Sequence, residues 1–102
     1  MSRIEFEWDE AKNLSNRRKH GLSFEEASQV FRDPLHVSIL ERVAHGEERW
    51  KTFGAVAELS LLVVAHTLYE DSEDDDAVEV VRIISAREVT RKARRFYEEE
   101  NG

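Results

Sequence analysis

The run Lys19-His20-Gly21 places a titratable imidazole beside a lysine and a glycine. Histidine gives or takes a proton near neutral pH, and the lysine ammonium is a compact partner for phosphate. Because glycine commonly ends a helix, both side chains are expected at a helix C-terminus. An ordinary alternative stays open, since cationic side chains stabilise helix C-termini without performing any chemistry.

A second group, Glu47-Glu48-Arg49-Trp50-Lys51, is expected on a strand. Glu48 and Trp50 then point to one face, and Glu47, Arg49 and Lys51 point to the other. In this arrangement Arg49 can contact a phosphate, and a carboxylate can act as a base. The alternative is a solvent-facing edge strand whose charges form surface ion pairs.

Two arginines, Arg82 and Arg87, lie within and just after an apolar segment near the end of the chain. Arg82 shares a strand face with Val80 and Ile84, so we expect it to be partly buried. A buried guanidinium needs either a carboxylate or a bound anion, and both partners stay open for Arg82. Arg87 is expected at the start of the last helix, where backbone N–H groups favour an anion.

The predicted last helix has one basic side and one apolar side. Arg87, Arg91, Arg94 and Arg95 fall on the basic side, which is suited to a polyanion such as RNA. Tyr97 follows Phe96, and its own pattern is that of an aromatic side chain packed on the core face of a helix.

The chain as a whole is acidic, although it contains these basic patches. The net charge is −7, and the segment from Glu70 to Glu79 contains seven acidic residues and no basic one. Glu98, Glu99 and Glu100 add further negative charge, so the rest of the chain is net positive. Local patches, more than the total, steer a polyanion to a surface.

The composition excludes several kinds of site. The chain has no cysteine, which excludes disulfides, thiolate metal sites and cysteine nucleophiles. Its four histidines are scattered, without the spacing of a helical metal pair, so we expect no metal and no cofactor. The N-terminus is charged at once and is no signal peptide. The longest apolar run, Leu59 to Ala65, is too short to cross a bilayer, so we expect a cytoplasmic protein without membrane association.

Periodicity predicts the elements that carry these residues. Arg3 to Trp8 alternate as a half-buried strand. Asp9 caps a helix that runs to about His20, with Ala11 and Leu14 facing a core. A capping box, Ser23-Phe24-Glu25-Glu26, then opens a second short helix, which ends at Asp33-Pro34.

Strands are expected after these helices at His36–Val43, Glu47–Gly54, Leu59–Tyr69 and Val78–Ile84. The acidic segment Glu70–Ala77 has no periodicity and is expected to be a solvated loop. Ser85 to Glu88 repeats the capping-box pattern and is expected to open the last helix. The chain is therefore predicted to form a single domain, residues 1–102, of the α+β class. We expect a mostly antiparallel sheet with helices packed on one face, in the order β-α-α-β-β-β-α.

The order of these motifs carries more information than any one of them. Nearly the whole chain resembles the BrnT family, through the runs FEWDEAKN (6–13), KHG (19–21), SFEEA (23–27), VFRDP (30–34), EERW (47–50) and RIISAR (82–87), followed by Tyr97. These proteins are toxins of type II toxin–antitoxin systems. The resemblance implies a RelE-like α+β fold and metal-independent cleavage of RNA. It also implies an antitoxin partner with a ribbon-helix-helix DNA-binding part, and a toxin homodimer within the complex.

The resemblance assigns site residues by motif. An RNA 2′-OH that attacks the adjacent phosphate needs a base, an acid for the leaving oxygen, and cations for the phosphorane. His20 or Glu48 is the expected base, Arg49 and Arg82 stabilise the transition state, and Lys19 and Arg87 hold flanking phosphates. The resemblance adds Tyr97 to the catalytic candidates.

Two other functions stay open. One is an inactive homologue that serves as an antitoxin-binding co-repressor, and the other is an RNA-binding domain without chemistry. The chain departs from the family pattern at Leu68, near an expected basic position, and in the acidic segment that follows.

Overall fold

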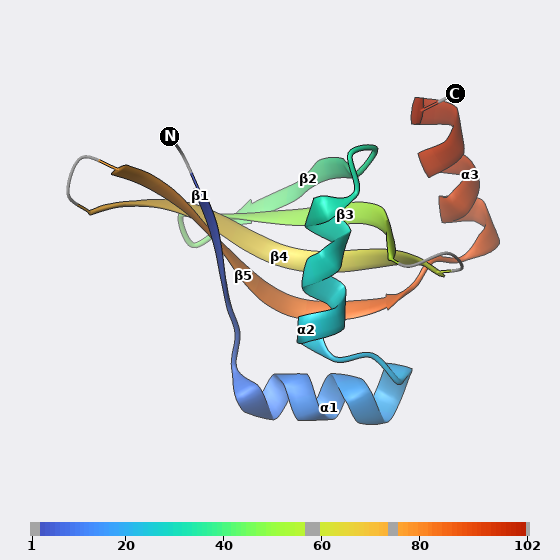
Figure 1. Ribbon diagram of the computed structural model, residues 1–102, viewed down its shortest axis with the longest axis horizontal. Coiled ribbons are helices and arrows are strands. Elements are labelled where there is room, and N and C mark those ends of the chain that lie inside the picture. Colours follow the sequence, from blue (N-terminus) through green and yellow to red (C-terminus); the bar gives the residue numbers. More distant parts are fainter. Residues whose placement is uncertain (1–2, 57–59, 74–75, 102) are drawn as a thin grey trace.

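The computed structural model describes residues 3–56, 60–73 and 76–101. Within these residues the chain forms one mixed sheet of five strands, together with helices (Figure 1). The elements are β1 (Arg3–Glu7), α1 (Glu10–His20), α2 (Phe24–Ala27), the 3-10 helix η1 (Ser28–Arg32), β2 (Val37–Ala44), β3 (Glu47–Val56), β4 (Ser60–Glu73), β5 (Asp76–Glu88) and α3 (Arg91–Asn101). The α+β class is confirmed. The expected order β-α-α-β-β-β-α has three strands between the second and last helices, whereas the structure has four, β2 to β5.

The spatial order of the strands is β1-β5-β4-β3-β2. β1 pairs with β5 in parallel, and the other neighbours pair antiparallel. The apolar β4 lies at the centre of the sheet, between β5 and β3. β1 and β2 are the edge strands, at opposite sides of the sheet.

One face of the sheet is covered by α2 and η1, which cross it in front in Figure 1. Gly54 permits this close approach, because a Cβ atom there would lie 2.7 Å from Val30 Cγ1 and 2.9 Å from the Val30 carbonyl oxygen. The core lies between these helices and the sheet, and its fully buried members are Phe24, Ala27, Val30, Leu62, Val64, Val81, Ile83 and Ala86. The opposite face, hereafter the open face, carries the alternate side chains of the same strands.

Helix α1 is held by polar side chains, so the expectation that Ala11 and Leu14 face a core is wrong. Asn13 and Asn16 are buried instead, while Leu14 is 46% exposed. Asn16 donates to the Ala86 carbonyl over 2.9 Å and accepts from the Ala86 N–H over 3.1 Å. The pairing of β1 with β5 stops at Arg82, so beyond it the edge of β5 has free backbone groups. Asn16 satisfies two of them, as a further strand would.

The acidic segment is not a loop in the residues that the structure describes. β4 continues to Glu73 and β5 begins at Asp76, with Glu70 opposite Glu79 and Glu73 opposite Asp76. Residues 74 and 75 lie outside the described part of the chain. Glu70, Asp71 and Ala77 are exposed in this hairpin extension, and pairing of its backbone requires no apolar alternation. Figure 1 shows it projecting beyond the rest of the sheet.

The last helix begins later than predicted. Ser85 to Glu88 belong to β5, where they pair with Ala65 to Leu62 of β4, and α3 begins at Arg91. Pairing with the central strand therefore prevails over a local capping pattern. Arg87 lies on a strand, and its expected position at a helix start is wrong.

Helix α3 also departs from the expectation that the helices share one face. Its Phe96 ring lies 5.9 Å from that of Phe53. Phe53 points to the open face, since its neighbour Gly54 faces η1. α3 therefore stands at one end of the sheet (Figure 1), with Phe96 toward the open face.

Candidate functional site

A row of polar side chains crosses the open face from edge to edge. Strand register aligns Glu7 with Arg82, Arg82 with Thr67, Thr67 with Arg49, and Arg49 with Arg42. Paired residues point to the same side, and neighbouring strands lie about 4.8 Å apart. Arg49 and Arg82, which are distant in sequence, are thereby brought within two strands of each other on one face.

Arg49 has an unused donor in this row. Its Nε atom is buried and has no hydrogen-bond partner among the described residues. A buried N–H group without a partner costs about 1 to 3 kcal/mol, so an anion that accepts from it would bind favourably. Arg49 is thus available to a ligand.

Beside Arg49 the open face is hollowed. A cavity of about 330 Å³, hereafter hollow A, has the basic side chains of Arg42, Arg49, Lys51 and Arg87 in its wall. Lys51 pairs with Glu41 over 3.5 Å between two half-exposed groups, an interaction that solvent weakens. The remaining guanidinium groups leave hollow A with a positive character, suited to phosphate oxygens.

A second cavity of about 230 Å³, hereafter hollow B, lies along α1 and holds Lys19 and His20. The helix ends there as predicted, because Gly21 adopts the left-handed conformation with φ of 70° and its N–H bonds the Arg17 carbonyl. Hollows A and B share Ile84 and Ser85 in their walls. The two hollows therefore adjoin at these residues of β5, and they are hereafter called the trough.

A bulge in β5 shapes the junction of the two hollows. Ala65 pairs with Ser85 but the next residue, His66, pairs with Ile83, which leaves Ile84 as the extra residue. A bulge bends its strand and redirects side chains, and bulges are common beside functional sites. Here it lies where the hollows meet.

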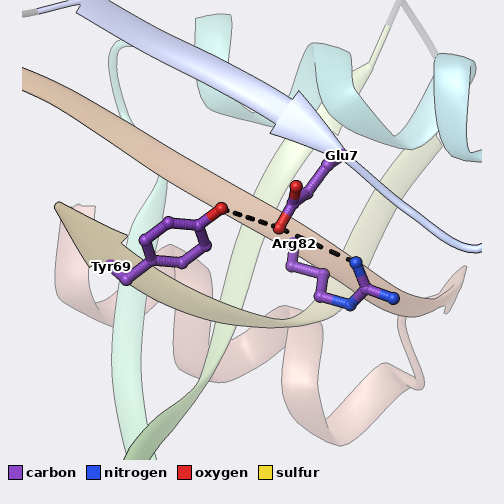
Figure 2. Close-up of polar contacts among 3 residues, drawn as sticks. All are labelled: Glu7, Tyr69 and Arg82. Atoms are coloured by element: carbon purple, nitrogen blue, oxygen red, sulfur yellow. Dashed lines mark hydrogen bonds and ion pairs between the residues drawn. The ribbon is translucent and has the colours of Figure 1, made fainter. Parts of the chain in front are cut away.

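Three strands bring Glu7, Tyr69 and Arg82 together at the β1 end of the row (Figure 2). The Tyr69 hydroxyl donates to Glu7 Oε1 over 3.0 Å, and Arg82 Nη1 lies 3.7 Å from the same oxygen. The hydrogen bond to Glu7 raises the pKa of Tyr69 above its ordinary value. The carboxylate alternative for Arg82 is therefore realised, with a partner at the surface and with Arg82 exposed instead of partly buried.

The structure separates other sequence candidates from the trough. Glu48 is exposed, and strand alternation points it away from Arg49, to the face that α2 covers. Arg91, Arg94 and Arg95 are exposed on α3; Arg94 lies 3.9 Å from Glu98, and Arg95 borders a different, apolar cavity with Phe53 and Phe96.

Tyr97 attaches α3 to the end of η1. Its hydroxyl donates to Asp33 Oδ2 over 2.6 Å, and burial together with this bond raises the pKa of Tyr97 to about 12. Burial pushes the pKa of Asp33 upward, but hydrogen bonds from the Ala55 N–H, the Tyr97 hydroxyl and the Leu35 N–H outweigh it and lower the pKa. This contact fits a structural role, holding α3 to the end of η1, better than a role in binding substrate.

Several residues of the candidate site cannot be predicted from the sequence. Alternation places Lys51 on the face of Arg49, but no motif or local pattern marks Arg42, Thr67, Glu7 or Tyr69. These residues are brought to the candidate site by the register between strands that are distant in sequence, and this register cannot be read from the sequence.

Among the described residues no group of three or more histidines and carboxylates is placed to hold a metal ion. In the same part of the chain, every helix is too short or too polar to cross a membrane.

The family model described as ribonuclease toxin, BrnT, of type II toxin–antitoxin systems matches residues 8–93. The chain belongs to the BrnT family. The resemblance inferred from the motifs is thereby confirmed, and membership implies an RNA target and an antitoxin partner. No curated protein matches the chain. Within the BrnT match lie Lys19, His20, Arg49, Arg82 and Arg87, whereas Glu7 precedes it.

Proposed function

We propose that this BrnT protein is an endoribonuclease that binds RNA along the row and the adjoining trough and cleaves it without a metal ion. The observation that carries the proposal is the meeting of separate sequence candidates around one hollowed surface. Arg49 and Arg87 line hollow A, Lys19 and His20 line hollow B, and the two hollows share Ser85. Cationic groups around a groove attract the RNA backbone and stabilise charge that develops on phosphate.

The proposed reaction uses the RNA's own nucleophile. His20 takes the proton from the 2′-oxygen, which forms a bond to the adjacent phosphorus as the bond from phosphorus to the 5′-oxygen breaks. Water supplies a proton to the departing oxygen, leaving a 2′,3′-cyclic phosphate and a 5′-hydroxyl. Arg49 and Arg82 stabilise the phosphorane, and Arg87 and Lys19 hold flanking phosphates.

Two residues that the BrnT motifs suggest for catalysis have other roles in this proposal. Glu48 points away from Arg49, which favours His20 as the base. Tyr97 makes a short bond to Asp33, which favours a structural role in holding α3. The exposed arginines Arg91, Arg94 and Arg95 can still attract RNA over a distance, as surface charges do.

The finer family expectations are part of the same proposal. We propose a RelE-like arrangement of the fold, an antitoxin with a ribbon-helix-helix part, a toxin homodimer within the complex, and a cytoplasmic location. Edge strand β2 supports a partner-binding role, because Ile39, Leu40 and Val43 are 38%, 43% and 63% exposed. Exposed apolar side chains on an unpaired edge are commonly covered by another chain.

RNA cleavage in EDTA tests this function. The wild-type protein should cleave with and without chelator, and Arg49→Ala should lower kcat/KM about 100-fold or more, as loss of a transition-state donor does elsewhere. The matched control is Arg32→Ala, which removes an exposed arginine at the end of η1, on the face of the sheet opposite the row. A requirement for added metal, or an Arg49→Ala rate within a few-fold of wild type, would contradict the proposal. Operator binding with the antitoxin but no cleavage would instead favour the co-repressor.

A further inference from the structure

Glu7 is a charged residue of the open face to which the BrnT motifs give no role in catalysis or RNA binding. It is the last residue of β1, and the chain around it is well held: Trp8 packs edge-on against Phe24 at 6.1 Å, and Asp9 caps α1. Its backbone position is therefore constrained from both sides. The carboxylate points to the open face, where it meets two side chains from other strands (Figure 2).

The contacts of Glu7 are arranged to hold Arg82. Tyr69 donates to Oε1 over 3.0 Å and so limits the rotation of the carboxylate. The same oxygen lies 3.7 Å from Arg82 Nη1. Arg82 has a long side chain with costly rotamer freedom, and a fixed neighbour reduces the freedom that it must lose when it binds a phosphate.

The place of Glu7 and Arg82 in the row determines how their charges would act on bound RNA. Thr67 separates Arg82 from Arg49, and its side chain is short and 6% exposed, so it forms a floor between the two guanidinium groups. Glu7 stands on the far side of Arg82 from Arg49. Its negative charge partly neutralises Arg82 in the free protein and also repels RNA.

We propose that Glu7, held by Tyr69, is a positioning residue that aligns Arg82 with Arg49 for one phosphate. The inference rests on the proposed ribonuclease function and names a residue that serves it indirectly. A positioning carboxylate has opposite effects on binding and turnover. Removal of its charge frees Arg82 for RNA and tightens binding, while loss of alignment slows the chemical step.

Glu7→Gln separates these effects, because glutamine keeps the size of the side chain and can still accept from Tyr69. Affinity for a fully 2′-O-methylated RNA, which lacks the nucleophile, should rise about two- to five-fold. The single-turnover cleavage rate should fall about ten-fold. Tyr69→Phe keeps the charge but removes the hydroxyl, and should lower the rate about three-fold with little change in affinity.

Glu5→Gln is the matched control. It removes the same charge from the same face of β1, but Glu5 pairs with Arg3 over 3.3 Å at an exposed position. Its cleavage rate should equal that of the wild type. In an Arg82→Ala background, Glu7→Gln should have no further effect on the rate, because the residue through which it acts is gone.

The outcomes distinguish the inference from the function on which it rests. Slower cleavage by Arg82→Ala with a wild-type rate for Glu7→Gln would overturn the role of Glu7 and leave the ribonuclease intact. Glu7→Gln that lowers rate and affinity together, or that still slows Arg82→Ala, would also overturn it. An inactive wild type, or an Arg82→Ala rate equal to wild type, would overturn the proposed site and this inference with it.

Discussion

Replacement of Asn16 by alanine should destabilise the protein far more than its place on a polar helix suggests. The Asn16 amide is 5% exposed and bonds the Leu22 carbonyl, the Ala86 carbonyl and the Ala86 N–H at 2.9 to 3.1 Å. Alanine removes the partner of all three backbone groups, two of them on a buried part of β5. A buried group left without its partner costs about 1 to 3 kcal/mol. We therefore expect a loss of about 2 to 4 kcal/mol.

Urea unfolding followed by circular dichroism measures this loss. With an m value of about 1 to 3 kcal/mol per M, the midpoint should fall by roughly 0.7 to 4 M. Leu14→Ala is the control from the same helix, and at 46% exposure it should cost under about 1 kcal/mol. In an ordinary amphipathic helix the order would be reversed, because replacing the apolar residue would cost more stability than replacing the polar one. An Asn16→Ala cost below that of Leu14→Ala would therefore refute the idea that side-chain amides hold α1 to the sheet edge.

Two further predictions concern buried polar groups. Burial lowers the pKa of His66, so the unfolded chain binds more protons than the folded one below a pH of about 6.5. The free energy of unfolding should therefore fall as the pH drops through that range. In urea titrations at several pH values, His66→Asn should flatten this dependence of stability on pH. An unchanged slope would show that His66 does not cause it. Tyr97→Phe should cost about 1 kcal/mol at pH 7, and less once Asp33 is protonated at low pH. It should retain RNA cleavage within about three-fold, whereas a loss near 100-fold would place the phenol at the reaction.

Local signals in the sequence predicted local structure well. Asp9 caps α1 through its side chain, Gly21 ends it with a positive φ, and Ser23 and Glu26 form both bonds of the capping box. Each of these features depends on residues within one turn of each other, so neighbours in sequence suffice to specify it. The same pattern failed at Ser85 to Glu88, because β4 offered that segment a full ladder of backbone bonds.

The family and the identity of most site candidates also came from the sequence. Lys19, His20, Arg49, Arg82 and Arg87 stand in motifs whose order along the chain marks the BrnT family. Alternation alone also places Glu48 and Arg49 on opposite faces of their strand. These inferences needed only residue types, spacing and period, which the chain displays without folding.

Tertiary structure alone decided how those residues meet. The row from Glu7 to Arg42 joins all five strands, and its members are up to 75 positions apart in numbering, from Glu7 to Arg82. A slip of one residue in any pairing would turn a strand's side chains to the other face. The register depends on packing across the whole sheet, so no local pattern contains it. For the same reason the sequence named the arginines of this toxin but did not reveal that Glu7 and Tyr69 hold one of them.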